Sequence, residues 1–262
     1  VDMADSAGGR SSEIIVLLLI IPIFFLTITL HEVGHLVAGW LVGFKFYSVQ
    51  VGPLRLARTP SGMKLDTQWA LALAGSMAVS YAATTENLKR RALWYYAGGP
   101  LASLVSFLIA LTTFALNEGW PQEPMGLALA DLPVLFFMGN SLLITVLTLI
   151  PSRMMGMASD GARIFSILLA TPRAKRDLAL FALFGLSHSG VRPRDWDPKW
   201  IDELLVSDGP NFMTAVAYAS AYTCAIDREA HVEAREYLQH AIDAIETRNL
   251  SFRPSLMLEA VY

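Results

Sequence analysis

His31 and His35 stand four residues apart in the segment His-Glu-Val-Gly-His at residues 31–35, the part of this chain best suited to chemistry. On a helix this spacing puts both imidazoles on one face, where they can bind one metal ion. Glu32 lies one position round the helix, which suits a base acting on water rather than a ligand. Ordinary helices also produce this pattern by chance, as two surface histidines and an acid. Here the motif follows residues 14–30, which carry no charge and could lie in a membrane. Inserting a polar group at mid-membrane depth costs roughly 2.5–3.5 kcal/mol, so three such groups are not expected there by chance. We therefore expect a metal site.

The composition indicates a membrane protein. Of the 262 residues, 54% are hydrophobic and 16% are charged, which is too apolar for an ordinary soluble domain. The net charge of −3 gives no reason to expect a nucleic-acid partner. Cys224 is the single cysteine, so an internal disulfide and a cysteine zinc cluster are both excluded. Any zinc must therefore be held by histidine, aspartate or glutamate.

Three segments are long and apolar enough to cross a membrane, which requires about 20 residues. They lie at about residues 13–44, 92–116 and 132–151. Residues 69–83 are apolar but brief, which favours a re-entrant or interfacial segment. Residues 178–187 are shorter still and are expected either on the membrane surface or in a soluble core. The fold class is therefore an α-helical polytopic membrane protein with about three core spans.

The basic residues predict the orientation of these spans. No lysine or arginine lies in residues 117–131, between the second and third spans, whereas more basic residues follow the third span. Seven basic residues lie between the first two spans: Lys45, Arg55, Arg58, Lys64, Lys89, Arg90 and Arg91. The positive-inside rule then places the N-terminus outside and the C-terminus in the cytoplasm. We expect an integral multi-pass protein of the bacterial inner (cytoplasmic) membrane.

Residues 46–65 alternate in the manner of strands around the turn signal Pro60-Ser61-Gly62, which predicts a small membrane-proximal hairpin or sheet. Two roles are open for it. It can be a structured connector, or it can offer an exposed edge on which an extended substrate pairs by strand addition.

The C-terminal part reads as soluble and all-α. Two helices are expected at residues 212–226 and 229–247, hinged at Asp227, and they resemble a tetratricopeptide-type helix pair. A further helix starts at Pro254 and is left unfinished, so we expect this region to be truncated. The predicted organisation is a flexible N-terminus, a transmembrane domain and a soluble helical region, at residues 1–12, 13–190 and 191–262.

Two histidines leave a catalytic zinc short of protein ligands, because such sites usually have three plus water. No suitable residue follows His35 closely, so the third ligand must come from another element. Asp160, in Ser159-Asp160-Gly161, is a candidate. In isolation this tripeptide is more typical of a turn and a helix N-cap.

In combination these pieces resemble the site-2 protease family of intramembrane zinc metalloproteases. The matching elements, within about residues 13–170, are the 31–35 motif, Gly98-Gly99-Pro100, Pro151 and Asp160-Gly161. The resemblance implies one catalytic Zn²⁺ held by His31, His35 and Asp160. It also implies Glu32 as the catalytic acid/base and a membrane-protein substrate, cleaved in regulated intramembrane proteolysis.

The chain departs from the family pattern between the third span and Asp160. Thr148 stands where an asparagine would be expected, and the stretch from Pro151 to Asp160 is longer than usual. Asn140 is a candidate substitute for substrate binding, together with Gly99 and Pro100. Asn140 can equally be an interhelical hydrogen-bonding residue.

The expected function is peptide-bond hydrolysis in membrane-spanning substrates by a zinc metalloprotease. The alternative is a non-catalytic metal-binding scaffold that recruits a protein partner through its C-terminal helices. The intact Glu32 favours the enzyme, because a structural metal site has no need of a base beside its ligand. A transporter would be expected to show repeated halves, which three spans do not supply.

Overall fold

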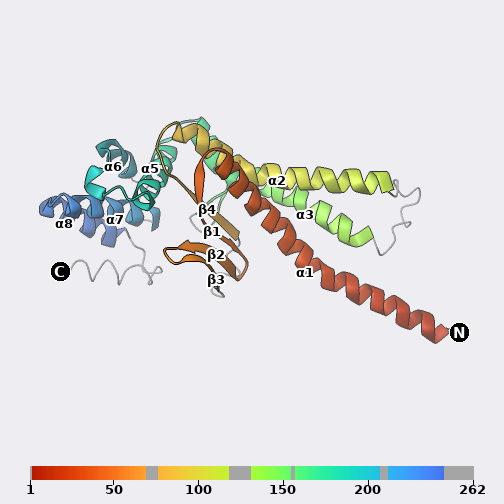
Figure 1. Cartoon of the computed structure of the whole chain (residues 1–262). Helices are drawn as coiled ribbons and strands as arrows, with labels where there is room; N and C mark the ends of the chain where they lie inside the picture. The colour runs from red at the N-terminus through yellow and green to blue at the C-terminus, as the bar shows by residue number, and fades with distance from the viewer. Residues whose placement is uncertain (1, 69–75, 118–130, 155–156, 207–211, 245–262) are drawn as a thin grey trace. The chain divides into compact units, whose positions relative to one another are not determined.

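The computed structural model is mostly helical (Figure 1), and it describes residues 2–68, 76–117, 131–154, 157–206 and 212–244. Contacts between residues divide the chain into two compact units. The first unit comprises Val1–Val42, Phe46–Ser80 and Trp94–Ile150. The second comprises Gly43–Lys45, Tyr81–Leu93 and Pro151–Tyr262.

The three expected spans are helices α1 (Asp2–Leu41), α2 (Leu88–Asn117) and α3 (Leu132–Leu149). Each contains a stretch long and apolar enough to cross a membrane, at Leu18–Leu41, Leu88–Leu116 and Leu132–Leu149. Among the described residues, the number of helices that could cross a membrane is therefore the three that the sequence predicted. Helix α1 begins much earlier than expected, so residues 2–12, predicted to form a flexible N-terminus, belong to the helix.

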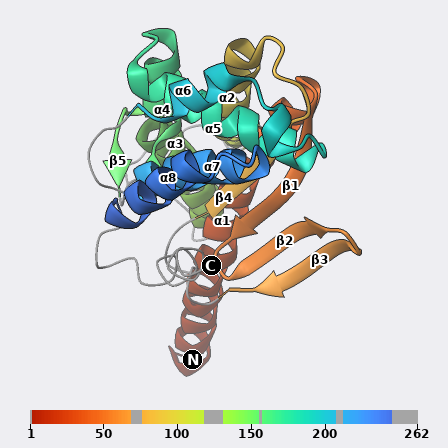
Figure 2. The same cartoon turned by 90° about the vertical axis from the view of Figure 1, so that its left-hand side faces the viewer.

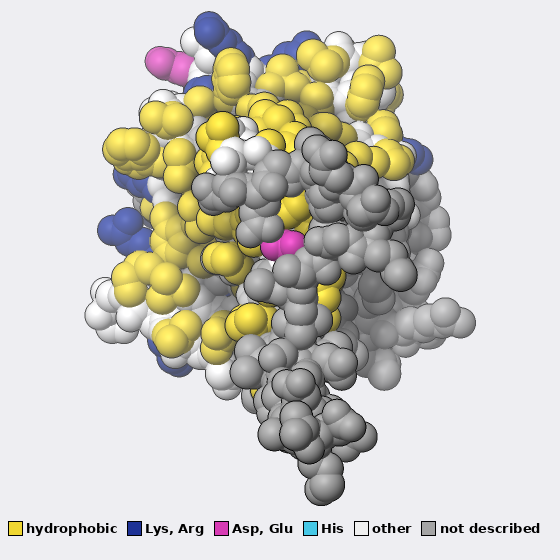
Figure 3. Space-filling model, turned by 90° about the vertical axis from the view of Figure 1, so that its right-hand side faces the viewer, with side chains coloured by type: hydrophobic (Ala, Val, Ile, Leu, Met, Phe, Trp, Pro, Cys, Tyr) yellow, Lys and Arg dark blue, Asp and Glu magenta, His cyan; other side chains and the backbone are white. Residues whose placement is uncertain are grey.

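The apolar side chains of these helices face outwards. Only 11% of the α3 stretch is buried, against 22% and 28% for those of α1 and α2. Ile21 and Ile109 are more than 60% exposed, as is Leu116. Hydrophobic side chains occupy much of the described part of the face in Figure 3. Such a surface fits a lipid environment.

A four-stranded sheet, most of whose residues belong to the first unit, contains the predicted hairpin. Its strands are β1 (Phe44–Val51), β2 (Leu54–Thr59), β3 (Gly62–Thr67) and β4 (Ser76–Ala82), in the order β3-β2-β1-β4. The pairs β1–β2 and β2–β3 are antiparallel, with Val49 opposite Leu56 and Leu56 opposite Leu65. The β1–β2 turn requires positive φ at Gly52, whose missing side chain leaves room for Phe25.

Strand β4 corrects one expectation. Residues 69–83 were predicted to form a re-entrant or interfacial segment, but Ser76–Ala82 is a strand next to β1. Residues 69–75 lie outside the described residues. An apolar run this short has no periodicity that separates strand from helix, so pairing with β1 decides its structure.

The second unit holds the short strands β5 (Arg153–Met154) and β6 (Met157–Ala158), which pair antiparallel, and then helices. The helices are α4 (Asp160–Leu168), α5 (Pro172–His188), the 3-10 turn η3 (Pro193–Asp195), α6 (Pro198–Leu204), α7 (Phe212–Asp227) and α8 (His231–Asp243). Ala179 and Leu183 of α5 pack in one core with Leu204 and Ala221. Residues 178–187 are thus part of a packed helical core, the second of the two predicted alternatives.

The predicted C-terminal helix pair is confirmed in α7 and α8, which lie side by side in both Figure 1 and Figure 2. Ala234, Leu238 and Ala241 form the expected buried stripe of α8. Asp227 ends α7, where its carboxylate accepts hydrogen bonds from the Arg192 guanidinium at 2.5 Å and the Arg194 amide at 3.0 Å. These bonds join the η3 turn to the end of α7.

Candidate metal centre

His31 and His35 lie one turn apart on α1 and are 5% and 6% exposed. Their Nε2 atoms are 3.3 Å apart. Two nitrogens bound tetrahedrally at about 2.0–2.1 Å from zinc would lie roughly 3.3–3.4 Å apart. The helical spacing therefore places the two Nε2 atoms at the distance that binding to one metal ion requires.

The opposite ring nitrogens of both histidines are held by α2. His35 Nδ1 lies 2.8 Å from the backbone oxygen of Tyr95, and His31 Nδ1 lies 3.0 Å from Ser103 Oγ. Because a carbonyl can only accept, Nδ1 of His35 carries the hydrogen and its Nε2 keeps a lone pair for a metal. The Gly99 amide also approaches His35 Nδ1, at 3.4 Å, but the shorter carbonyl contact decides the tautomer.

Glycines let α2 come close enough to hold the histidines. A Cβ atom on Gly99 would collide with the imidazoles of both His31 and His35. One turn away, a Cβ on Gly34 would collide with the backbone oxygen of Gly98, and one on Gly98 would collide with that of Gly34. Helices in membranes use such small residues to pack closely. The Gly98-Gly99 pair is therefore a spatial requirement of the two-histidine site.

Asp160 is the third member of the group. One ligand atom from each of His31, His35 and Asp160 lies within 4.8 Å of the others, so the group could hold a metal ion. Asp160 is the first residue of α4, and the N-cap is its neighbour Ser159, whose Oγ accepts from the Ala162 amide at 3.2 Å. The helix N-cap expected from the tripeptide is therefore present: Ser159 caps the helix, and Asp160 belongs to the metal group.

The donor set of this group fits zinc. Zinc binds imidazole nitrogen and carboxylate oxygen, and three such protein ligands are typical of a site that leaves one position for another molecule. The group includes no thiolate, in keeping with the single cysteine on α7, which is buried.

Glu32 is 4% exposed and is not a member of the metal group. Its Oε1 accepts a hydrogen bond from Ser76 Oγ at 2.5 Å. Ser76 opens β4, so an edge strand of the sheet orients the glutamate next to the first histidine. Nothing in the sequence motif indicated Ser76, Ser103 or Tyr95, because each lies on an element distant from it in the chain.

The residues predicted to bind substrate lie on α2 and α3. Gly99 contacts the histidines, and Pro100 follows it as a buried residue inside α2. Asn140 is on α3 and is not in the metal group. Its Nδ2 and the Oγ of Ser141 are buried with no hydrogen-bond partner among the described residues. The structure therefore gives no contact that separates the two predicted roles of Asn140.

No protein-family model, curated protein or solved structure matches the chain. The resemblance to site-2 proteases consequently rests on the sequence motifs alone.

Proposed function

We propose that this protein is an intramembrane zinc metalloprotease that hydrolyses peptide bonds of membrane-spanning substrates. The observation that carries the proposal is the His31–His35–Asp160 group together with the buried Glu32 beside it. These residues occur in a chain with three helices long and apolar enough to cross a membrane. A purely structural metal site would not need a buried carboxylate adjacent to its ligands.

His31, His35 and Asp160 would hold the zinc. When bound, zinc supplies Lewis acidity, which polarises a carbonyl group and makes water a stronger acid. The contacts of Tyr95 and Ser103 to the Nδ1 atoms keep each ring in place. Such outer contacts typically change metal affinity about 10–100-fold when removed.

Glu32 would act as the general acid/base. Its carboxylate takes a proton from the attacking water and passes it to the leaving amine, which restores the carboxylate at the end of the cycle. The hydrogen bond from Ser76 holds Oε1 and limits the rotation of the carboxylate. Oε2 is then the oxygen that we assign to proton transfer.

A substrate helix has all its backbone hydrogen bonds satisfied internally and must unwind locally before cleavage. The two outer strands of the described sheet, β3 and β4, are the places where an unwound segment could pair. We favour β4, because its residue Ser76 bonds to Glu32. This choice differs from the sequence expectation, which considered only the hairpin edge.

Replacing Glu32 by glutamine tests the proposal. The amide side chain of the Glu32→Gln variant would still accept the Ser76 hydrogen bond but would not take a proton, so cleavage should fall about 10²–10⁴-fold while bound zinc is retained. The assay follows a panel of co-expressed single-span proteins tagged at both ends, with zinc measured on the same preparations. Glu236→Gln, at an exposed position of α8, is the matched control and should cleave normally.

Two outcomes would contradict the proposal. Equal cleavage by the wild type and a zinc-replete Glu32→Gln variant would remove Glu32 from the reaction. If the wild type cleaves no member of the panel while its C-terminal helices still capture a partner, the scaffold alternative would replace the enzyme.

A further inference from the structure

Strand β4 runs from the residue that contacts Glu32 into the second unit. At its start, Ser76 Oγ donates a hydrogen bond to Glu32 Oε1. At its end, Tyr81 and Ala82 are 8% and 1% exposed and belong to the second unit. A strand rises about 3.3 Å per residue, so the two ends lie about 20 Å apart. The position of Ser76 therefore depends on what holds the rest of the strand.

Tyr95 of α2 holds the strand two residues after Ser76. Its hydroxyl donates a hydrogen bond to the backbone oxygen of Ala78 at 2.7 Å. The backbone oxygen of the same Tyr95 lies 2.8 Å from Nδ1 of His35. Tyr95 is 5% exposed, and hydrogen bonds shielded from water in this way are stronger than exposed ones. One buried residue thus contacts both a member of the metal group and the strand that orients Glu32.

Helix α5 holds the far end of the strand. A Cβ atom on Gly185 would collide with the backbone oxygen of Ala82, so the helix lies directly against the strand. Glycine allows two backbones to approach this closely because it has no side chain. On either side of Gly185, the rings of Phe184 and His188 lie 6.4 and 5.3 Å from that of Tyr81, centroid to centroid.

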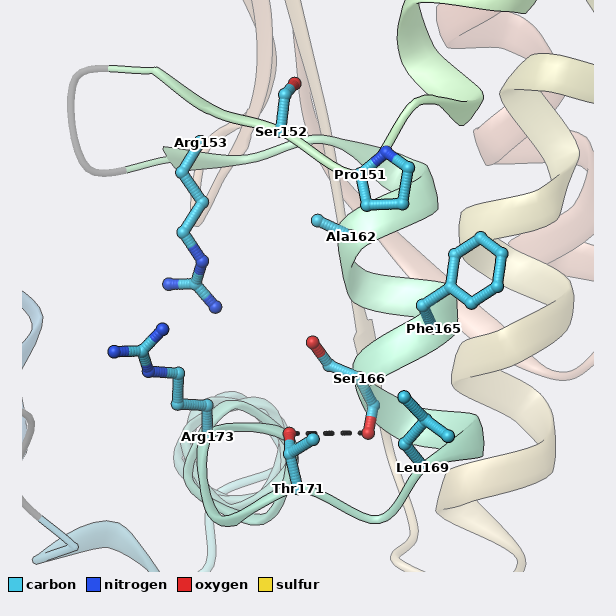
Figure 4. Close-up of a pocket in the computed structure, with 9 residues that line it drawn as sticks. All are labelled: Pro151, Ser152, Arg153, Ala162, Phe165, Ser166, Leu169, Thr171 and Arg173. Atoms are coloured by element: carbon cyan, nitrogen blue, oxygen red, sulfur yellow. Dashed lines mark hydrogen bonds between the residues drawn. The ribbon is translucent and has the colours of Figure 1, made fainter.

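Helix α5 is also joined to the helix that begins at Asp160. Figure 4 shows the connection between α4 and α5, where the Thr171 hydroxyl donates a hydrogen bond to the backbone oxygen of Ser166 at 3.4 Å. The Thr171 side chain also caps α5 by accepting from the Ala174 amide at 3.2 Å. The helix that supports β4 is therefore fixed to the helix that carries the third member of the metal group.

We propose that β4 sets the position of Glu32 for proton transfer, and that Tyr95 and Gly185 are positioning residues that act through Ser76. Tyr95 fixes the strand to α2, and Gly185 fixes it to α5. The proposal rests on the proposed proteolysis, since Glu32 transfers a proton only in that reaction. It extends the machinery of the reaction to a helix of the second unit.

The Tyr95 hydroxyl can be removed while its ring and backbone remain. In Tyr95→Phe the backbone oxygen still meets His35, so bound zinc should be retained. The value of kcat, measured on a panel substrate that the wild type cleaves, should fall about 2–10-fold, the effect of losing one buried hydrogen bond. Tyr218→Phe is the matched control, because Tyr218 lies on α7 and stacks on His240, and kcat should be unchanged.

A double-mutant cycle separates positioning from general destabilisation. Ser76→Ala removes the hydrogen bond that Tyr95 supports, so adding Tyr95→Phe to it should cause no further loss of kcat. Independent effects would multiply instead. Multiplied losses would overturn the proposal, as would a wild-type kcat in either single variant or an equal loss in Tyr218→Phe.

Gly185→Ala tests the far end of the strand. The added methyl group must push α5 away from Ala82, so kcat should fall, and it should fall no further when the substitution is combined with Ser76→Ala. Ser187→Ala, at an exposed position of the same helix, is the control and should cleave normally. Bound zinc and the thermal midpoint identify the variants that are folded. In a folded Gly185→Ala variant, an unchanged kcat would remove α5 from the positioning of Glu32.

Amide hydrogen exchange gives a readout that does not depend on cleavage. Residues 76–82 should exchange faster in Tyr95→Phe than in the wild type, because the strand loses one of its supports. If the wild type cleaves no member of the panel, the proposed function fails, whereas faster exchange would still support the anchoring of β4 by Tyr95. Unchanged exchange at residues 76–82 would overturn the proposal whether or not the protein is a protease.

Discussion

At the scale of single residues, the candidate metal centre brings together side chains from two distant segments. His31→Ala, His35→Ala and Asp160→Ala should each reduce bound zinc to below roughly a tenth of the wild-type content, because loss of a ligand exceeds the 10–100-fold effect of losing an outer contact. Zinc is measured by mass spectrometry of metal in purified protein after dialysis. His240→Ala, on the exposed side of α8, should keep full zinc. Full zinc in Asp160→Ala would remove Asp160 from the site.

A substitution at Gly99 tests the packing around the two histidines without changing a ligand. In Gly99→Ala the added methyl group collides with both imidazoles, so the helices must shift, at a cost of about 1–3 kcal/mol. We expect zinc affinity to fall by at least about tenfold in a metal-competition titration. Gly139→Ala on α3 is the control, since no described atom lies within 4 Å of its added Cβ. Unchanged affinity in Gly99→Ala would mean that α2 does not pack against the histidines.

At the scale of elements, the η3 turn and the end of α7 are joined by Asp227. The hydrogen bond from Arg192 and that from the Arg194 amide lower the pKa of Asp227 from its ordinary value of 3.8. A carboxylate with a lowered pKa adds stability that is present above the unfolded-state pKa and is lost as pH falls through the folded-state pKa. This stabilisation is therefore complete at neutral pH and disappears below about pH 3.8.

Asp227→Asn should lower the thermal midpoint at pH 7, and the difference from the wild type should shrink as the pH falls below 3.8. The effect should be small, because Arg192 is exposed to solvent and salt screens such pairs. Tryptophan fluorescence reports the transition, since Trp196 lies in the adjoining core. Asp202→Asn, at an exposed position of α6, supplies the comparison. A difference that persists at low pH would assign the effect to packing instead of charge.

At the scale of the whole molecule, the basic residues predict the orientation of the spans. Single cysteines at Ser61, Glu123 and Ser207, in a chain with Cys224 replaced by alanine, should react with a membrane-impermeant label from outside only at Glu123. The reason is that seven basic residues lie in residues 45–91, before the apolar run that starts at residue 92, whereas residues 117–131 contain none. External labelling at Ser61 or Ser207 would reverse the orientation.

Cys224 itself is a poor target for such a label. It is 3% exposed, and burial raises the pKa of its thiol, so little thiolate is available. Replacing it still matters, because a partly unfolded fraction would expose it.

Local patterns were enough to predict several features of this protein. The four-residue spacing of His31 and His35, the three apolar spans and the alternation in residues 46–65 each depend on helical or strand periodicity. The same holds for the helix pair α7 and α8, whose buried stripe repeats at helical spacing. Periodicity is a property of neighbouring residues, so it can be read without knowing what packs against them.

Contacts between distant segments were decided only by the tertiary structure. The local sequence around Asp160 favoured a turn, and the distinction between the cap Ser159 and the metal-group member Asp160 depends on what each side chain meets. Ser76 reaches Glu32 because residues 76–82 pair with β1, which their own composition did not predict. Ser103 and Tyr95 reach the histidines because glycines let α2 approach α1. A chain segment carries its own periodicity wherever it folds, whereas its partners are determined by how all the segments pack together.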